Sequence, residues 1–269
     1  MRVLVALLAL WPGLWPGLVG AEALQSNCQA MAEAGPRIEL AALVLPPVDT
    51  VRLRYLTHSE FALQTPGGVL VVTDYTGVVG NAEVVPDVVT MNHAHESHYT
   101  DHPDPRIPLL VKGWPIDGVP AFYDLQVGDL RIHNVTTDTR GPWGEGGQRN
   151  GNSIFMFEAA GLCIVHLGHL HQIPNPVQYA NIGRVDVVMV PVDGGFTMTQ
   201  DAMIEVVGRL HARVVIPMHW FTLQSLNAFL AKMEGSWVIE DRQGPELEVS
   251  LGSLPARPTV VLLTPALFP

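Results

Sequence analysis

Short apolar runs separated by polar turn residues recur through the first two thirds of the chain. Several runs are apolar at every position, which is typical of strands buried on both faces of a sheet. The sequence Thr-Pro-Gly-Gly at Thr65–Gly68 lies between two such runs and predicts a hairpin turn. We therefore predict strands at Val51–Leu56, Val69–Thr73, Val88–Met91, Leu130–Thr136, Ser153–Phe157, Leu162–Leu167 and Val185–Val190.

Helical patterns are fewer. Thr199–His211 and Thr222–Met233 each place their apolar residues on one face, and Thr199 is suited to be an N-cap. A further helix is predicted at Leu24–Ala34. Many strands with a few flanking helices predict packed sheets covered by helices. The remaining predicted strands are Arg213–Ile216, Glu246–Leu251 and Thr259–Leu263.

The first 23 residues have the three parts of a secretory signal peptide: a basic start, an apolar stretch and a small-x-small end. A retained membrane anchor is the alternative, which Pro12 and Pro16 weaken. We therefore predict export to the periplasm or medium, with residues 24–269 forming a single domain and no later segment able to span a membrane. Export allows a Cys28–Cys163 disulfide, whereas a free buried Cys163 is the alternative.

The amino-acid composition excludes several classes of protein. The chain has 269 residues, with 26 acidic against 15 basic side chains and a net charge of -11, so it is a poor candidate for nucleic-acid binding. Its apolar fraction of 48% excludes an intrinsically disordered chain, and its two cysteines exclude a disulfide scaffold. The Gly-rich segment 140–152 is either a lid over a site or an ordinary surface connection.

Histidine is the unusual residue type, with 11 in the chain. Three groups of histidines follow predicted strands, where the ends of buried strands converge on one edge of the sheets. Neutral imidazole suits zinc, iron, nickel or copper, so the pattern predicts a transition-metal site. His102, His133 and His211 are interpreted as ordinary surface or core residues. The three groups are His93, His95 and His98; His166, His169 and His171; and His219.

At these residues the chain resembles the metallo-β-lactamase fold superfamily, in particular the branch of ascorbate-6-phosphate lactonase-like metal-dependent hydrolases. The segment His93-Ala-His95-Glu96-Ser97-His98 occupies the place of a His-x-His-x-Asp-His motif. His166-Leu-Gly-His169 lies where that branch has His-x-Gly-Asp, and Pro217-Met218-His219 is similar to its final ligand segment. The resemblance implies an α/β (α+β) fold, a four-layer αββα sandwich.

The resemblance also implies the ligands. One metal would be held by His93, His95 and His166, and a second would lie near His98 and His219. Ser97 and His169 replace the two metal-binding carboxylates of the motifs. Either His169 completes a second three-histidine site with His98 and His219, or the site is mononuclear with an open position.

Several neighbouring residues are candidates for supporting roles. Glu96 is a candidate general base or partner of a histidine, and Ser97 a candidate hydrogen-bond partner of a metal-bound water. Asp74 and Asp193 are candidates for orienting ligating histidines. His58 is a candidate for lining the pocket, and His171 for supporting a ligand.

The implied function is an exported hydrolase with one or two Zn²⁺ ions or other transition metals. A metal-bound hydroxide would attack a lactone, ester, amide or phosphodiester. Two sites without carboxylates would favour a small-molecule substrate that is anionic. The alternatives are a non-catalytic exported metal-binding protein on the same fold and a metal-free protein that binds a small ligand.

Overall fold

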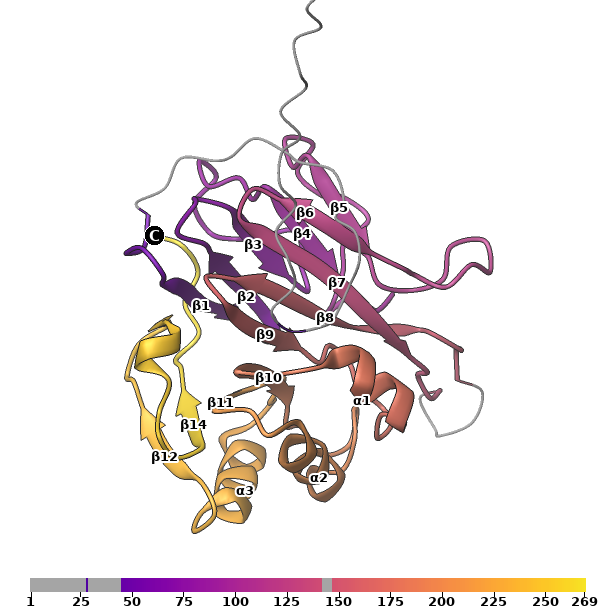
Figure 1. Ribbon diagram of the computed structural model, residues 1–269. Helices are drawn as coiled ribbons and strands as arrows, with labels where there is room; N and C mark the ends of the chain where they lie inside the picture. The colour runs from indigo at the N-terminus through magenta and orange to yellow at the C-terminus, as the bar shows by residue number, and fades with distance from the viewer. Residues whose placement is uncertain (1–27, 29–44, 142–146) are drawn as a thin grey trace, which may run out of the picture.

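The computed structural model describes Cys28, residues 45–141 and residues 147–269, and it contains two β-sheets (Figure 1). The first sheet has the order β13-β1-β2-β3-β4-β5. Its strands β1 to β3 are antiparallel, whereas β3, β4 and β5 run parallel. The strands are β1 (Val51–Thr57), β2 (Glu60–Gln64), β3 (Leu70–Thr73), β4 (Val88–Met91), β5 (Leu109–Lys112) and β13 (Glu246–Val249).

The second sheet has the order β12-β14-β11-β10-β9-β8-β7-β6. Strands β6 to β9 form an antiparallel meander, and β9, β10, β11, β14 and β12 run parallel. The strands are β6 (Asp124–Val127), β7 (Leu130–Thr137), β8 (Asn152–Ala159), β9 (Leu162–His166), β10 (Val187–Pro191), β11 (Val214–Met218), β12 (Val238–Asp241) and β14 (Thr259–Leu262).

The main apolar core lies between the two sheets. Alternate residues of β1, including Leu53 and Tyr55, pack with Phe155 and Phe157 of β8 and with Ile164 of β9. This alternation is what the two-residue side-chain period of a strand requires when one face is buried. The inner faces of the two sheets therefore form one continuous core.

The outer face of the eight-stranded sheet is covered by helices α1 (Pro176–Ile182), α2 (Gln200–Leu210) and α3 (Leu223–Met233). Figure 1 shows the three helices together on one side of the molecule. The side-chain oxygens of Thr199 and Thr222 accept hydrogen bonds from the first turns of α2 and α3. The short 3-10 helix η1 (Leu251–Ser253) follows β13.

The outer face of the six-stranded sheet carries a smaller apolar cluster, to which Tyr75 and Val79 contribute. The C-terminal segment crosses this face: Ala266 N–H donates to Tyr55 O at 2.9 Å, and Phe268 N–H donates to Val79 O at 2.8 Å. Phe268 packs against the cluster. In the part of the chain that the structure describes, loops and this terminal segment take the place of a helical layer on that side.

The predicted α/β sandwich of two sheets is confirmed, and each strand predicted from the sequence is present with small shifts at its ends. Among the described residues, helices cover one outer face of this sandwich, whereas the four-layer prediction has helices on both. Helices α2 and α3 also match their predictions. The pattern did not predict β2, β5, β6, β12 or α1. The predicted signal peptide, the predicted helix Leu24–Ala34 and residues 142–146 of the Gly-rich segment lie outside the described residues.

A disulfide joins Cys28 to Cys163 of β9, with 135 residues of sequence separation. This decides between the two alternatives for Cys163 in favour of the bridge. Among the described helices, none combines the length and apolar character needed to cross a bilayer.

Candidate metal centre

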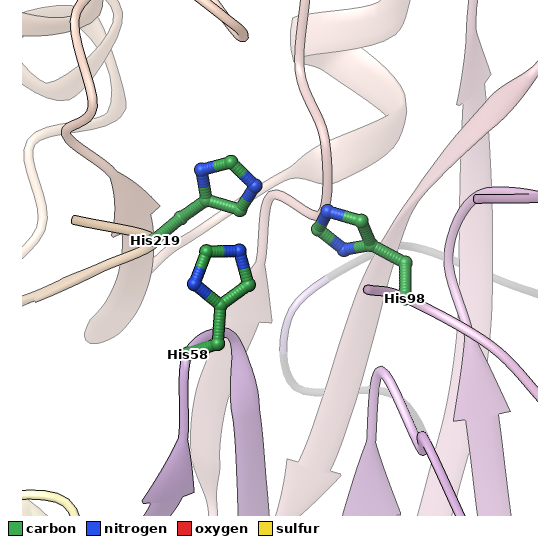
Figure 2. Close-up of side chains that lie close together, drawn as sticks. All are labelled: His58, His98 and His219. Atoms are coloured by element: carbon green, nitrogen blue, oxygen red, sulfur yellow. The ribbon is translucent and has the colours of Figure 1, made fainter. Parts of the chain in front are cut away.

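Three histidines from different parts of the fold point toward one another (Figure 2). His58 lies in the turn between β1 and β2, His98 in the loop after β4, and His219 directly after β11. One ring nitrogen from each lies within 4.8 Å of the others. The six-stranded sheet thus supplies two of these imidazoles and the eight-stranded sheet supplies the third.

The hydrogen bonds of these rings leave nitrogens available for a ligand. His98 Nδ1 lies 2.7 Å from Asp74 Oδ2, and His219 Nδ1 lies 3.1 Å from Asp193 Oδ2. A carboxylate accepts, so each Nδ1 carries the proton and each Nε2 has a lone pair. The Nε2 atoms of His98 and His58 are buried without a hydrogen-bond partner among the described residues. Because buried polar atoms are normally paired, these two orphaned nitrogens fit a metal ion.

Burial keeps the imidazoles of His58 and His98 neutral, as metal ligation requires. Burial, together with the neighbouring His219, lowers the pKa of His58 to about 4. Burial, followed by the surrounding imidazoles, lowers the pKa of His98 well below its ordinary value. His58 and His98 are therefore neutral at neutral pH, and their unpartnered Nε2 atoms are available as ligands.

The two carboxylates behind the rings differ. Burial raises the pKa of Asp74 to about 6, opposed by His166 and by a hydrogen bond from the Asn92 N–H. Burial also acts to raise the pKa of Asp193, but hydrogen bonds from His219, Thr197 and Gly195 outweigh it and lower that pKa. Asp193 is thus firmly ionised, and Asp74 titrates closer to neutrality.

The backbone at the site is unusual. His58, Asp74 and His219 have φ values of 39°, 47° and 55°, the left-handed region that residues other than glycine rarely adopt. The carbonyl of His58 accepts from Tyr55 Oη–H at 2.6 Å and from His219 N–H at 2.8 Å. These bonds tie the β1–β2 turn to the end of β11 and hold two ligand-bearing residues in conformations that would cost free energy elsewhere.

Further histidines adjoin this group. The His169 ring lies 4.6 Å from the His98 ring and 4.9 Å from the His219 ring, measured between centroids. His93 stacks on His169 at 5.2 Å, and His95 lies 6.0 Å from His169. The structure therefore gathers all but one of the six predicted ligands around one centre, and it adds His58.

His166 is the exception. Its Nε2 lies 2.8 Å from Ser59 O and donates to it, and its Nδ1 accepts from Gly168 N–H at 3.1 Å. Both ring nitrogens are thus engaged by the protein, and the ring is fully buried. In this arrangement His166 links β9 to the β1–β2 turn and has no lone pair to offer a metal.

The predicted catalytic candidates lie at the edge of the cluster. Glu96 is exposed. Ser97 Oγ lies 2.8 Å from Nδ1 of His95, which itself is exposed. Their catalytic roles stay predictions. His102 and His211 are exposed, and His133 lies 3.1 Å from Glu158 Oε1, away from the cluster.

His58 is the residue whose importance the sequence understated, since it was expected only to line the pocket. It lies in the turn between β1 and β2, and the search for histidines that follow apolar strands did not select that turn. Phe221 contacts the same group, with its ring 5.0 Å from His58, and Phe196 packs against Phe221 at 5.1 Å. Phe196 and Phe221 are 69% and 58% exposed and form an aromatic rim beside the histidines.

Comparison with known proteins identifies the family of the chain. The family model of the beta-lactamase superfamily domain matches residues 52–219, more than half of the chain, and this span contains every histidine of the cluster. The chain belongs to the metallo-β-lactamase superfamily. It is a metal-dependent hydrolase of that superfamily, as the motif resemblance predicted.

The individual relatives of this chain have low sequence identity to it. The chain is 28% identical to a protein of Anaeromyxobacter dehalogenans described as a metal-dependent hydrolase, over 63% of this chain and 74% of that protein. A protein of the same description from Methanoculleus marisnigri is 25% identical over 68% of this chain and 87% of its own length.

Solved structures show the same fold. A Thermotoga maritima protein described as a zinc-dependent hydrolase of the metallo-β-lactamase superfamily superimposes with a TM-score of 0.58. It is 29% identical, and the match covers 79% of this chain and 98% of that chain. A metallo hydrolase from Ignicoccus hospitalis, 19% identical, has a TM-score of 0.51 over 69% of this chain and 91% of its own, and shares the fold.

Proposed function

We propose that this superfamily hydrolase is exported and that its reaction centre is the group His58, His98 and His219, where it binds a transition metal, preferentially zinc. The substrate class we propose is a lactone, ester, amide or phosphodiester. The observation that supports the centre is the pair of buried, orphaned Nε2 atoms on His58 and His98. When bound, such an ion acts as a Lewis acid and lowers the pKa of water.

The residues of this chain have defined tasks in such a reaction. Asp74 and Asp193 accept the Nδ1 protons of His98 and His219 and so fix the orientation and tautomer of both rings. The interaction of Tyr55 with the His58 carbonyl holds the third ring in its turn. Burial of His98 and His219 excludes bulk water, which strengthens every electrostatic interaction in the site.

The aromatic rim and the histidine cluster together limit the chemical type of substrate. The exposed rings of Phe196 and Phe221 adjoin His58 and would cover an apolar substituent next to the scissile bond. The ligands of the cluster are uncharged imidazoles, which leave a divalent charge only partly compensated by Asp74 and Asp193. This supports a reacting group that is anionic or develops negative charge.

Export is supported by two features. The first 23 residues read as a signal peptide, and a disulfide joins Cys28 to Cys163, as is usual for proteins of oxidising compartments. Intact mass and N-terminal sequencing of protein recovered from the periplasm or medium should show a chain that begins near Leu24. Recovery of the full-length chain in the cytoplasm with free thiols would contradict export.

The hydrolase proposal is tested by metal analysis and a substrate panel. Protein purified without added metal should contain close to one or two transition-metal ions per chain, and esters with an apolar acyl group should be hydrolysed faster than acetyl analogues. His98→Ala should abolish both metal retention and turnover, whereas the exposed His211→Ala should change neither. Full metal retention with no turnover on the whole panel would favour the non-catalytic metal-binding protein.

A further inference from the structure

A chain of hydrogen bonds runs from a backbone amide into the histidine cluster. Arg140 N–H donates to Nδ1 of His171 at 2.7 Å. On the other edge of that ring, Nε2 of His171 lies 2.8 Å from Nδ1 of His169. The loop that supplies the amide is itself anchored, because the Arg140 guanidinium donates to the carbonyls of Gly195 and Thr197.

The protons in this chain have one consistent placement. A backbone N–H can only donate, so Nδ1 of His171 is an acceptor and carries no proton. Every imidazole carries at least one proton, so the proton of His171 lies on Nε2 and is donated to His169. Nδ1 of His169 is then also an acceptor, and the proton of His169 must lie on its Nε2.

This tautomer is the reverse of that of the rings around it. His93 donates from Nδ1 to Gly151 O at 2.7 Å, and His98 and His219 donate from Nδ1 to carboxylates. These three rings have their lone pairs on Nε2. His169 alone among the four has a hydrogen-bond donor there.

The position of His169 is fixed from several sides. The backbone N–H of His169 donates to Oδ1 of Asn152 at 2.8 Å. The preceding Gly168 has φ +60°, and a Cβ on it would lie 2.5 Å from the same Asn152 oxygen. The residue is 8% exposed, and its ring packs against the His98, His219 and His93 rings. The ring is therefore held within the cluster.

We propose that His169 does not ligate metal in this protein but is a neutral N–H donor that binds an oxygen of the substrate, with His171 as the positioning residue that sets its tautomer. The proposal rests on the proposed function of the cluster. The donor would stabilise negative charge that develops on a carbonyl or phosphoryl oxygen. It also limits metal ligation to rings whose Nε2 is unprotonated.

Long-range ¹H–¹⁵N NMR of histidine-labelled protein tests the tautomer directly. In both the metal-free and the zinc-loaded protein, His169 should show a protonated Nε2 and an unprotonated Nδ1, whereas His98 and His219 should show the opposite. Assignment uses the His169→Gln and His171→Gln variants. A His169 Nε2 that loses its proton or shifts as a metal ligand on zinc addition would overturn the proposal.

Metal affinity provides a second test. His169→Gln keeps an N–H donor, and its zinc affinity should stay within about threefold of wild type, whereas His98→Gln should lose about 100-fold or more. A loss in His169→Gln equal to that in His98→Gln would identify His169 as a ligand. Both this measurement and the NMR are independent of turnover, so they decide the role of His169 even if no substrate of the panel is cleaved.

Kinetics on any substrate found completes the test. His169→Leu removes the donor and should lower kcat by about 100-fold or more with little change in KM, as expected for a contact that strengthens in the transition state. His169→Gln should recover part of that loss. Equal activity of the Leu variant and wild type would contradict the donor role.

Discussion

At the scale of single residues, the two aspartates behind the ligand rings are not equivalent. Asp193 receives four hydrogen bonds in addition to its contact with His219, including those from Gly195, Phe196 and Thr197. Asp74 is fully buried and accepts from Asn92 N–H and from His98. Asp193 therefore fixes the loop that follows it as well as the ring of His219. Asp74 fixes the ring of His98 and the backbone at Asn92.

Asp193→Asn should weaken metal binding about 10- to 100-fold, because the amide replaces the charged acceptor that orients His219. Competition with a chelator of known affinity measures the change. The control is Asp201→Asn, an exposed aspartate whose partner is Lys232 on the surface. Equal zinc affinity in wild type and Asp193→Asn would show that His219 needs no charged partner.

Glu60 makes stability depend on pH. Its burial raises its pKa to about 8, although Thr76 donates to both of its oxygens. The folded chain thus keeps a proton that the unfolded chain releases above pH of about 4.5, so stability should fall as pH rises from about 5 to about 8. Glu60→Gln, measured by urea denaturation of chelated protein, should remove most of that fall, of about 1–4 kcal/mol.

The control for Glu60 is Glu83→Gln, since Glu83 is exposed. This variant should follow the wild-type pH profile. A wild-type stability that stays flat from pH 5 to pH 8 would mean that Glu60 is ionised in the folded state throughout.

At the scale of elements, the sequence predicted the strands and helices that have a regular pattern of apolar residues. Strand β4 and the caps of α2 and α3 follow from apolar runs and threonines, which local physics determines. Strand β12 alternates between half-buried and exposed positions and contains acidic residues, so its pattern did not stand out. Helix α1 is short and begins at Pro176, and only its capping box of Asn175 and Gln178 marks it in the sequence.

The site was predictable to the extent that strand ends show which residues converge. His98 and His219 follow β4 and β11, and both join the three-histidine group. His58 joins the group from a turn with positive φ, and Nε2 of His166 donates to the carbonyl of Ser59 across the sheets. Neither the turn conformation nor a contact 107 residues away in sequence can be inferred from a local pattern.

The end of β9 depends on a glycine. Gly168→Ala should destabilise the fold by more than about 1 kcal/mol, because its φ of +60° disfavours a side chain and the Cβ would collide with Asn152 and Asn92. Thermal and urea denaturation measure the loss. Gly208→Ala in α2 is the matched control: nothing lies within 4 Å of the new Cβ, and helix propensity predicts a gain of about 0.5–1 kcal/mol.

At the scale of the whole molecule, one covalent bond joins Cys28 to the central part of the eight-stranded sheet. Reduction should lower the free energy of unfolding by about 2–4 kcal/mol, because the bridge closes a long loop in the unfolded chain. Guanidinium denaturation with and without reductant measures this. The double variant Cys28→Ala/Cys163→Ala should not respond to reductant, and an unchanged wild-type midpoint would contradict the prediction.

The three histidines that point toward one another come from both sheets. His58 and His98 lie in loops of the six-stranded sheet, and His219 lies directly after β11 of the eight-stranded sheet. An ion bound by all three is therefore also a crosslink between the two halves of the sandwich. Unfolding separates those halves, so the midpoint of thermal unfolding must rise with the logarithm of the free ion concentration above its dissociation constant. The fraction of this protein that is folded at a given temperature therefore depends on the free metal concentration around it.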